Sequence, residues 1–282
     1  MSTPTATIEP LTDEQVQFFR DNGYLKIDKV TSDEDVATLR ESYDRIFREK
    51  AGWEEGGQFD LGGTEQDGEP TLPQILSPAK YAPEMLDSEL YANVSAIGKR
   101  LLGDNCVTAF AHAIYKPPHS GAETPWHQDA SYWDPSTISK TISVWVPLQE
   151  ATLENGCMHF VPGSHKLDVI KHQSINNDPR IHGLEVHPDD MHHVEGNVVA
   201  CPLPPGGATM HGGYTLHYAP PNRSDIPRRA IILMCSVPGE KRDQPLRFPW
   251  LEEKKTAGMK RREAAQKQQE QQGGSADADT DQ

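Results

Sequence analysis

The chain has few cysteines and no long hydrophobic run. Its four cysteines lie far apart and form no CxxC pair, namely Cys106, Cys157, Cys201 and Cys235. We therefore expect free, buried thiols in a reduced cytoplasmic protein and no disulfide framework. No apolar run approaches the roughly 20 residues that a membrane span needs, and Met1 to Pro10 lacks the apolar core of a signal peptide. These absences argue against a membrane partner.

Positive charge is also scarce. The sequence holds 27 Lys and Arg against 42 Asp and Glu, which gives a formal net charge of −15. Nucleic acids and anionic membranes bind to basic surfaces, so this balance argues against both. The length of 282 residues suits one large β-barrel-type domain with appendages or two modest domains. A small molecule is the expected partner.

The first hundred residues predict three helices and one strand. Thr12 and Gln15 form a capping box at the start of a helix that ends near Gly23. A short strand follows over Tyr24 to Val30. The second predicted helix runs from Ser32 to about Lys50, and the third from Asp87 to Leu102.

From Val107 onward the sequence predicts β-structure. Short apolar runs are separated by Pro, Gly and Asn, which is typical of an all-β sandwich or barrel. The predicted strands are Val107 to Tyr115, Thr141 to Leu148, Met158 to Val161, Asn197 to Cys201, Ala208 to Met210 and Arg229 to Val237.

Three segments have no sustained periodicity. Gly52 to Pro73 is rich in Gly and acid, and Lys166 to Glu195 is a polar insertion with many His and Asp residues. Long loops of this kind often cover a binding site, so we expect both to act as lids. Residues 252–282 are charged and Gln-rich, then small and acidic, and they predict a partly helical, largely disordered tail. Residues 1–251 then form a single domain with a core at about 107–237.

His127 and Asp129 are the strongest candidates for a metal site. Residues i and i+2 of a strand share a face, so their side chains can converge on one ion. His217 lies downstream and is followed by Asn222 and Arg228. Two imidazoles and one carboxylate form the facial triad of non-haem Fe(II) oxygenases, and an arginine offers a fork for a ligand carboxylate.

Several alternatives remain open within this pattern. His211 lies on the same stretch as His217 and competes with it for the third ligand position. Arg229 competes with Arg228, although alternation along a strand turns it outward if Arg228 points inward. His112 either lines the site or is a buried histidine with its hydrogen bonds satisfied. His182, His187, His192 and His193 form a second metal site or, as we expect, part of a solvated loop.

The chain resembles the phytanoyl-CoA dioxygenase family of Fe(II)/2-oxoglutarate-dependent oxygenases. The resemblance includes Phe19, Gly23 and Tyr24 near the N-terminus and is most specific between about residues 107 and 237. The matching blocks are Lys116-Pro117-Pro118, Trp126-His127-Gln128-Asp129, Asn155-Gly156-Cys157-Met158, Pro162-Gly163-Ser164-His165 and His217 to Asn222 with Arg228.

The resemblance implies a mainly β fold, a double-stranded β-helix (a cupin-like jelly roll), with the N-terminal helices packed outside. His127, Asp129 and His217 would hold Fe(II), and Arg228 would bind the C5 carboxylate of 2-oxoglutarate. Gln128, Trp145 and His112 are further predicted cosubstrate-binding residues, and Tyr132 and Trp133 predicted substrate contacts. Ala219 departs from relatives that carry a hydroxyl residue there.

The resemblance also implies the reaction. The enzyme would use O2 to convert 2-oxoglutarate to succinate and CO2 while it oxidises a small organic molecule of specialised metabolism. Hydroxylation is the expected outcome. Desaturation, epoxidation and rearrangement stay open. Asp129 fills the position that a halide would need, and no basic cluster marks a coenzyme A pocket. The alternatives are a non-redox cupin-like metal- or ligand-binding protein and a dioxygenase scaffold that has lost its activity.

Overall fold

The computed structural model describes residues 7–66 and 70–276, with side chains described as far as residue 270. The three predicted N-terminal helices are present as α1 (Asp13–Asn22), α2 (Asp33–Arg48) and α3 (Glu89–Leu102). The capping box of α1 is formed, because the Thr12 and Gln15 side chains each accept the other's backbone N–H. The helix ends at Gly23, whose φ of +79° suits a residue without a side chain.

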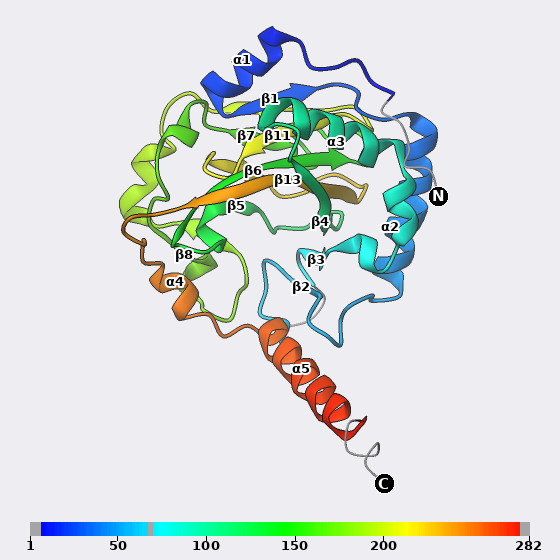
Figure 1. Cartoon of the computed structure of the whole chain (residues 1–282), viewed down its shortest axis with the longest axis vertical. Helices are drawn as coiled ribbons and strands as arrows, with labels where there is room; N and C mark the ends of the chain where they lie inside the picture. Colours follow the sequence, from blue (N-terminus) through cyan, green and yellow to red (C-terminus); the bar gives the residue numbers. More distant parts are fainter. Residues whose placement is uncertain (1–6, 67–69, 277–282) are drawn as a thin grey trace.

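Two antiparallel sheets form the centre of the molecule (Figure 1). The seven-stranded sheet has the order β1-β11-β6-β13-β4-β3-β2, and the four-stranded sheet has the order β10-β7-β12-β5. The strands of the first are β1 (Tyr24–Ile27), β2 (Gln58–Asp60), β3 (Pro73–Leu76), β4 (Val107–Lys116), β6 (Thr137–Pro147), β11 (Ala208–Gly212) and β13 (Arg228–Lys241). Those of the second are β5 (Thr124–His127), β7 (Met158–Phe160), β10 (Val199–Cys201) and β12 (His217–Ala219).

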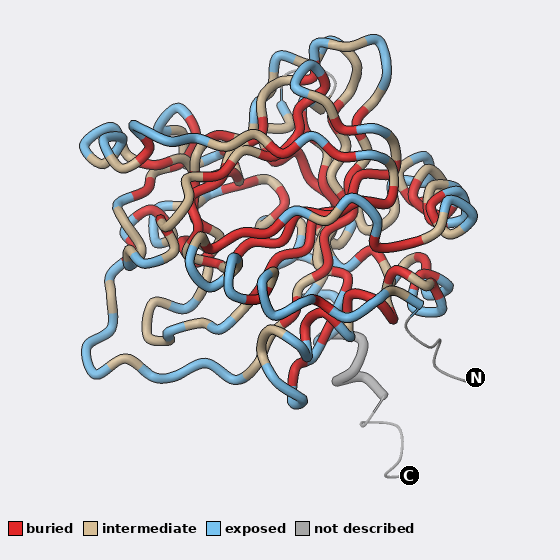
Figure 2. The backbone as a smooth tube through the Cα atoms, turned by 90° about the horizontal axis from the view of Figure 1, so that it is seen from above, coloured by how far each residue is buried: buried red, intermediate tan, exposed pale blue. Residues whose placement is uncertain are grey.

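Strand β13 shows how the sheets divide the interior. Ile231, Leu233 and Cys235 point to the outer face and pack with α2 and α3 in the main hydrophobic core. The alternate residues Ile232 and Met234 point to the inner face, toward a cavity between the sheets. Burial is accordingly concentrated along the central strands, and exposed residues gather in the peripheral loops (Figure 2). The helices therefore cover one face of the large sheet and leave its other face for a site.

All six predicted strands of the β region are present, with shifted ends. Strand β6 begins at Thr137 instead of Thr141, because its first residues pair with the far end of β13, which extends to Lys241. Strands β5 and β12 were not predicted. Each has only three or four residues, and Pro125 in β5 disfavours a strand assignment from sequence.

The two predicted loops contain more structure than their composition suggests. Gly52 to Pro73 includes β2, and Lys166 to Glu195 includes a hairpin of β8 (His172–Ser174) and β9 (Leu184–Val186). The 3₁₀ segments are Pro78–Lys80, Pro83–Asp87, Asp129–Tyr132, Ser164–Lys166, Ile175–Asn177 and Pro188–His193. All four cysteines are free and buried, as expected. In the parts of the chain described, no helix combines the length and apolarity that a bilayer span requires.

The tail, predicted to be partly helical and largely disordered, contains a long helix. After α4 (Pro249–Glu252), the chain forms α5 (Ala257–Ala276), which projects from the body (Figure 1). Its start is docked: the Arg261 guanidinium donates to the carbonyls of Trp53 and Gln58 at 2.8 and 3.0 Å. Charged side chains are held there by backbone acceptors of distant segments, which composition does not reveal. The predicted disordered end at 277–282 lies outside the described residues.

Candidate active site

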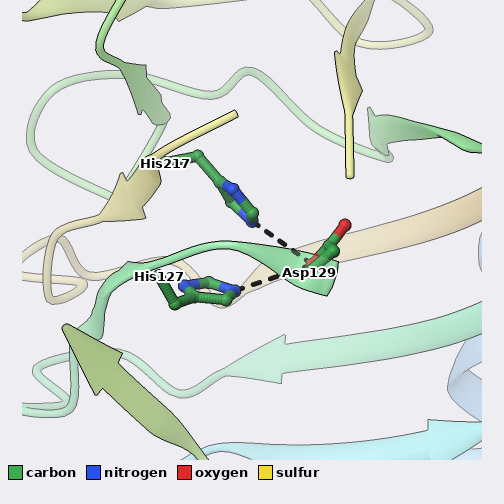
Figure 3. Close-up of side chains that lie close together, drawn as sticks. All are labelled: His127, Asp129 and His217. Carbon is green, nitrogen blue, oxygen red and sulfur yellow. Dashed lines mark ion pairs between the residues drawn. The ribbon is translucent and has the colours of Figure 1, made fainter. Parts of the chain in front are cut away.

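His127 and His217 face each other across two adjacent strands of the small sheet. They are paired in register between β5 and β12. The strand ends at His127, but Gln128 keeps an extended backbone (φ −114°, ψ 132°), so Asp129 returns to the face of His127. Asp129 Oδ1 lies 3.7 Å from His127 Nε2 and 3.5 Å from His217 Nε2 (Figure 3). The three predicted ligands therefore converge, with donor atoms within 4.8 Å of one another.

Backbone carbonyls set the protonation of both imidazoles. His127 Nδ1 lies 2.7 Å from the Pro125 carbonyl, and His217 Nδ1 lies 2.8 Å from the Thr215 carbonyl. A carbonyl only accepts, so each Nδ1 donates its proton and each Nε2 keeps a free lone pair directed at the site. Burial lowers the pKa of His127 to about 3, which keeps this imidazole neutral. Both rings are thus in the form that binds a metal.

Asp129 is held as a carboxylate. Burial raises its pKa, but His217 and His211 outweigh this effect, and the pKa lies well below its ordinary value. Its second oxygen, Oδ2, accepts a hydrogen bond from Ser143 Oγ at 2.6 Å and lies 3.3 Å from His211 Nε2. This leaves Oδ1 for the ion. Two neutral nitrogens and one oxygen anion fit Fe(II) with open coordination positions.

The competition between His211 and His217 is decided by geometry. His211 lies on β11 in the large sheet, opposite Ser143, whereas His217 pairs directly with His127. The group of converging donor atoms contains His217 and excludes His211. His211 is buried and faces the non-ligating oxygen of Asp129. His211 therefore lies beside Asp129 and outside the group of converging donor atoms.

Arg228 is a buried cation without an anionic partner. Its side chain is 1% exposed, its Nε has no hydrogen-bond partner, and no ion pair involves it in the described part of the chain. The guanidinium carbon lies 5.4 Å from the ring centre of Trp145. Burial lowers the pKa of Arg228 to about 10, so the group is still charged at neutral pH. Such a charge is poised for an anionic ligand.

Arg229 points the other way, as strand alternation predicts. Its Nε donates to Asp44 Oδ1 at 2.6 Å on the helix side of the sheet. Lys116, which pairs with Arg228 in the neighbouring strand, is also buried. Its Nζ donates to the carbonyls of Ala219 and Pro220 and thus ties β4 to the end of the strand that carries His217. Arg228 is therefore the arginine that faces the triad.

The triad and Arg228 line one cavity of about 940 Å³, a volume that includes its open mouth. Its walls include the predicted residues Trp145, His112, Tyr132 and Trp133. His112 thus lines the site, which was one of the two possibilities for it. Both predicted lids contribute, Leu61 from the first and His182 from the second. The structure brings all the predicted site residues to this cavity except Gln128.

Gln128, which was predicted to bind the cosubstrate, does not line the cavity. The residue is fully buried and turned away from the cavity, because it alternates with His127 and Asp129. Its amide nitrogen donates to the carbonyls of Asp168 and Tyr214, and its oxygen accepts from Ile170 N–H. Gln128 therefore holds two loops beside the site.

The histidine-rich segment splits into two parts. His182 enters the cavity, whereas His192, His193 and Asp190 lie together near the surface with donor atoms within 4.8 Å. Sequence reasoning did not find Ser143 or assign His182 to the cavity. A single serine in a strand carries no signal of its partner, and His182 could have been suspected only from its place in a predicted lid.

A donor set of this kind, facing an unpaired arginine between two sheets, is typical of non-haem iron oxygenases that use 2-oxoglutarate. Comparison with known proteins agrees. The chain belongs to the phytanoyl-CoA dioxygenase (PhyH) family, whose sequence profile matches residues 19–230. It is a 2-oxoglutarate-dependent dioxygenase.

Individual relatives support this assignment. A probable alpha-ketoglutarate-dependent hypophosphite dioxygenase from Stutzerimonas stutzeri is 30% identical over 228 residues, which cover 78% of this chain and 77% of the relative. Phytanoyl-CoA dioxygenase domain-containing protein 1 from Danio rerio is 28% identical over 263 residues, covering 78% and 88%. The structure of EvdO2 from Micromonospora carbonacea var. aurantiaca is 38% identical with a TM-score of 0.73, covering 87% and 99%. EvdO2 complexed with 2-oxoglutarate is also similar, at a TM-score of 0.72.

Proposed function

We propose that the chain hydroxylates a small organic molecule, with Fe(II) held by His127, Asp129 and His217 and with 2-oxoglutarate anchored by Arg228. The two facing sheets would form the double-stranded β-helix, or jelly roll, of this enzyme class. The observation that carries the proposal is the buried, unpaired guanidinium of Arg228 in the cavity that also holds the triad. A charge in that position costs stability unless a ligand compensates it.

Each residue has a defined task in this proposal. The Arg228 fork binds the C5 carboxylate through paired hydrogen bonds, and Trp145 limits its freedom from one side. Ser143 donates to Asp129 Oδ2 and keeps the carboxylate in one orientation. The carbonyls of Pro125 and Thr215 keep the two imidazoles in the ligating tautomer. Bound iron would couple decarboxylation of 2-oxoglutarate to oxidation of the substrate.

A non-redox cupin-like protein would also use histidines at the mouth of a jelly roll. It would have no need for a buried arginine that is left without a partner. A scaffold that has lost its activity is disfavoured because all three ligands and their supporting hydrogen bonds are in place. We also propose that the reaction belongs to specialised metabolism; SnoK of nogalamycin biosynthesis has the same fold at 24% identity.

The test combines metal binding with product formation. Protein reconstituted with Fe(II) and 2-oxoglutarate in air should form succinate slowly even without substrate. The Asp129→Ala variant should lose both bound iron and succinate formation, whereas Asp243→Ala, which alters an exposed carboxylate, should keep both. A wild-type protein that binds iron but shows no affinity for 2-oxoglutarate would contradict the proposal.

A further inference from the structure

We infer that Asp190, His192 and His193 form a second metal site, suited to zinc, near the surface of the protein. The three residues lie on the short 3₁₀ helix Pro188–His193, and none of them lines the cavity that holds the triad. Their ligand atoms lie within 4.8 Å of one another. The inference goes beyond the proposed function, because none of these residues takes part in it.

The local backbone brings the three ligands together. A 3₁₀ helix has three residues per turn, so residues i and i+3 lie one above the other. Asp190 and His193 have this spacing, and the rings of His192 and His193 have their centres 4.0 Å apart. The helix is anchored on both sides, because Val186 and Val194 are buried in the same hydrophobic cluster. The ligands therefore lie on a segment that packing holds in place.

The protonation of His192 suits a metal ligand. Its Nδ1 lies 3.1 Å from the Asp189 carbonyl, which can only accept, so Nδ1 donates its proton and Nε2 keeps a free lone pair. His193 makes no hydrogen bond within the described part of the chain, and its nitrogens are available to an ion. His187 differs, because its Nδ1 accepts from Asp189 N–H at 3.2 Å. It caps the helix and is not a ligand.

The Asp190 carboxylate has no cationic partner. The neighbouring Asp189 pairs with Lys171 Nζ at 2.9 Å and lies 3.2 Å from His187 Nδ1. Asp190 forms no ion pair among the described residues. Its Oδ2 accepts from Lys171 N–H at 2.8 Å, which fixes the carboxylate and leaves Oδ1 for an ion. A metal cation would supply the positive charge that this group lacks.

The ligand set selects the kind of metal. Two imidazoles and one carboxylate suit Zn²⁺ and its transition-metal neighbours, whereas Ca²⁺ and Mg²⁺ take oxygen ligands. Zn²⁺ usually has four ligands, so water would complete the set. Water can reach the site, because Asp190 and His193 are partly exposed and His192 is exposed. We therefore assign zinc as the ion.

The site lies next to a segment that supports the triad. Asp190 holds the N–H of Lys171, and the next residue, His172, accepts from Gln128 N–H at 3.1 Å through its Nε2. Gln128 stands between two of the triad residues in the sequence. An ion that fixes Asp190 would brace this segment. Zinc should therefore increase the stability of the folded chain.

The experiment counts zinc ions on the full chain, without an affinity tag and stripped of metal. Equilibrium dialysis against micromolar free zinc, followed by elemental analysis, gives the zinc bound per chain. Wild-type protein should hold two ions, one at the triad and one at the second site. The variant Asp129→Ala/His217→Ala, which removes two triad residues, should hold one.

Substitution of the second site should remove its ion selectively. His192→Gln/His193→Gln should weaken zinc binding there at least about tenfold and leave the ion at the triad. With all four changes combined, the chain should bind no zinc. Zinc should raise the thermal unfolding temperature of Asp129→Ala/His217→Ala and leave that of the combined variant unchanged.

His119→Asn is the matched control. His119 Nε2 lies 2.8 Å from Asp225 Oδ1, so it is another exposed histidine beside a carboxylate, but it belongs to no group of three ligands in the described residues. Its φ of +52° is one that asparagine also adopts. This variant should hold as much zinc as wild type.

Two results would overturn the inference. One is an Asp129→Ala/His217→Ala chain that binds no zinc at micromolar free metal. The other is zinc that remains bound after His192→Gln/His193→Gln is added to that variant. Neither result affects the proposed function, which is tested by iron and 2-oxoglutarate binding of the wild-type protein.

Discussion

Replacement of Arg228 by methionine should stabilise the ligand-free protein while destroying cosubstrate binding. The guanidinium is buried without an anion, and its pKa of about 10 corresponds to roughly 3 kcal/mol of unfavourable environment for the charge. At pH 7 the group is charged in both the folded and the unfolded state, so this cost is present in full. The substitution also removes the cation–π contact between Arg228 and Trp145, which lowers the gain in unfolding free energy by about 1 kcal/mol. We expect a net gain of about 2 kcal/mol in unfolding free energy.

The same change should weaken 2-oxoglutarate binding strongly. Removal of one partner from a buried charge pair costs about 3 to 5 kcal/mol, which is roughly a hundredfold to a few thousandfold in dissociation constant. The assays are urea unfolding with and without 2-oxoglutarate, and calorimetric titration of 2-oxoglutarate into the anaerobic Fe(II) protein. Wild-type protein should be stabilised by the cosubstrate, whereas Arg228→Met should not respond to it.

Arg229→Met is the matched control, because it removes the neighbouring arginine of the same strand. Arg229 pairs with a partly exposed Asp44, and such a pair contributes about 0 to 1 kcal/mol. The control should be slightly less stable than wild type and should bind 2-oxoglutarate normally. The reasoning is refuted if Arg228→Met is less stable than wild type and still binds the cosubstrate with wild-type affinity.

Three further predictions concern the supports of the site. The folded-state pKa of His172 is lowered to about 4 by burial, below its ordinary 6.5, so its contribution to stability is complete above pH 6.5 and is lost as the pH falls toward 4. The unfolding free energy of wild type should therefore fall between pH 7 and pH 5 by about 2 kcal/mol more than that of His172→Gln. Urea unfolding at both pH values measures the difference. Gln128→Leu leaves three backbone groups unpaired, so it should lower the unfolding free energy by about 2 to 4 kcal/mol. The affinity for 2-oxoglutarate should change little. A large loss of affinity at unchanged stability would instead show that Gln128 contacts the cosubstrate. Lys254→Met should speed the amide hydrogen exchange of residues 181–186, because it removes the hydrogen bonds to the carbonyls of residues 181–183. Lys255→Met, which alters the exposed neighbour, should not. Equal exchange in both variants would show that Lys254 does not hold this segment.

Local patterns in the sequence predicted much of the fold. The Thr12 and Gln15 capping box and the apolar face of α2 depend on residues three or four positions apart, so they are readable without tertiary information. The alternation of β13 likewise predicted that Arg228 and Arg229 lie on opposite faces, and the structure places Arg228 inside and Arg229 outside. Spacing of this kind belongs to the backbone geometry itself.

The metal ligands were predictable for a similar reason, but their supports were not. His127 and Asp129 share a face because of their spacing, whereas the choice of His217 over His211 depends on the pairing of β5 with β12. Sequence could not show that Ser143 would hold Asp129, since the two residues meet only when the large sheet faces the small one. Gln128 was assigned to the cosubstrate from the resemblance alone, although the alternation that puts His127 and Asp129 on one face puts Gln128 on the other.

The sequence by itself determined the N-terminal helices, most of the strands, and His127 and Asp129 as a pair of candidate metal ligands. Only the tertiary structure decided which histidine completes the triad, that His112 and His182 line the same cavity, and that Lys254 of the predicted tail fixes the loop of His182. The physical reason is the range of the interactions. Periodicity, capping and spacing act within a few residues. The cavity walls depend on contacts between distant segments, such as the hydrogen bond from Lys254 to the carbonyl of His182, 72 residues away.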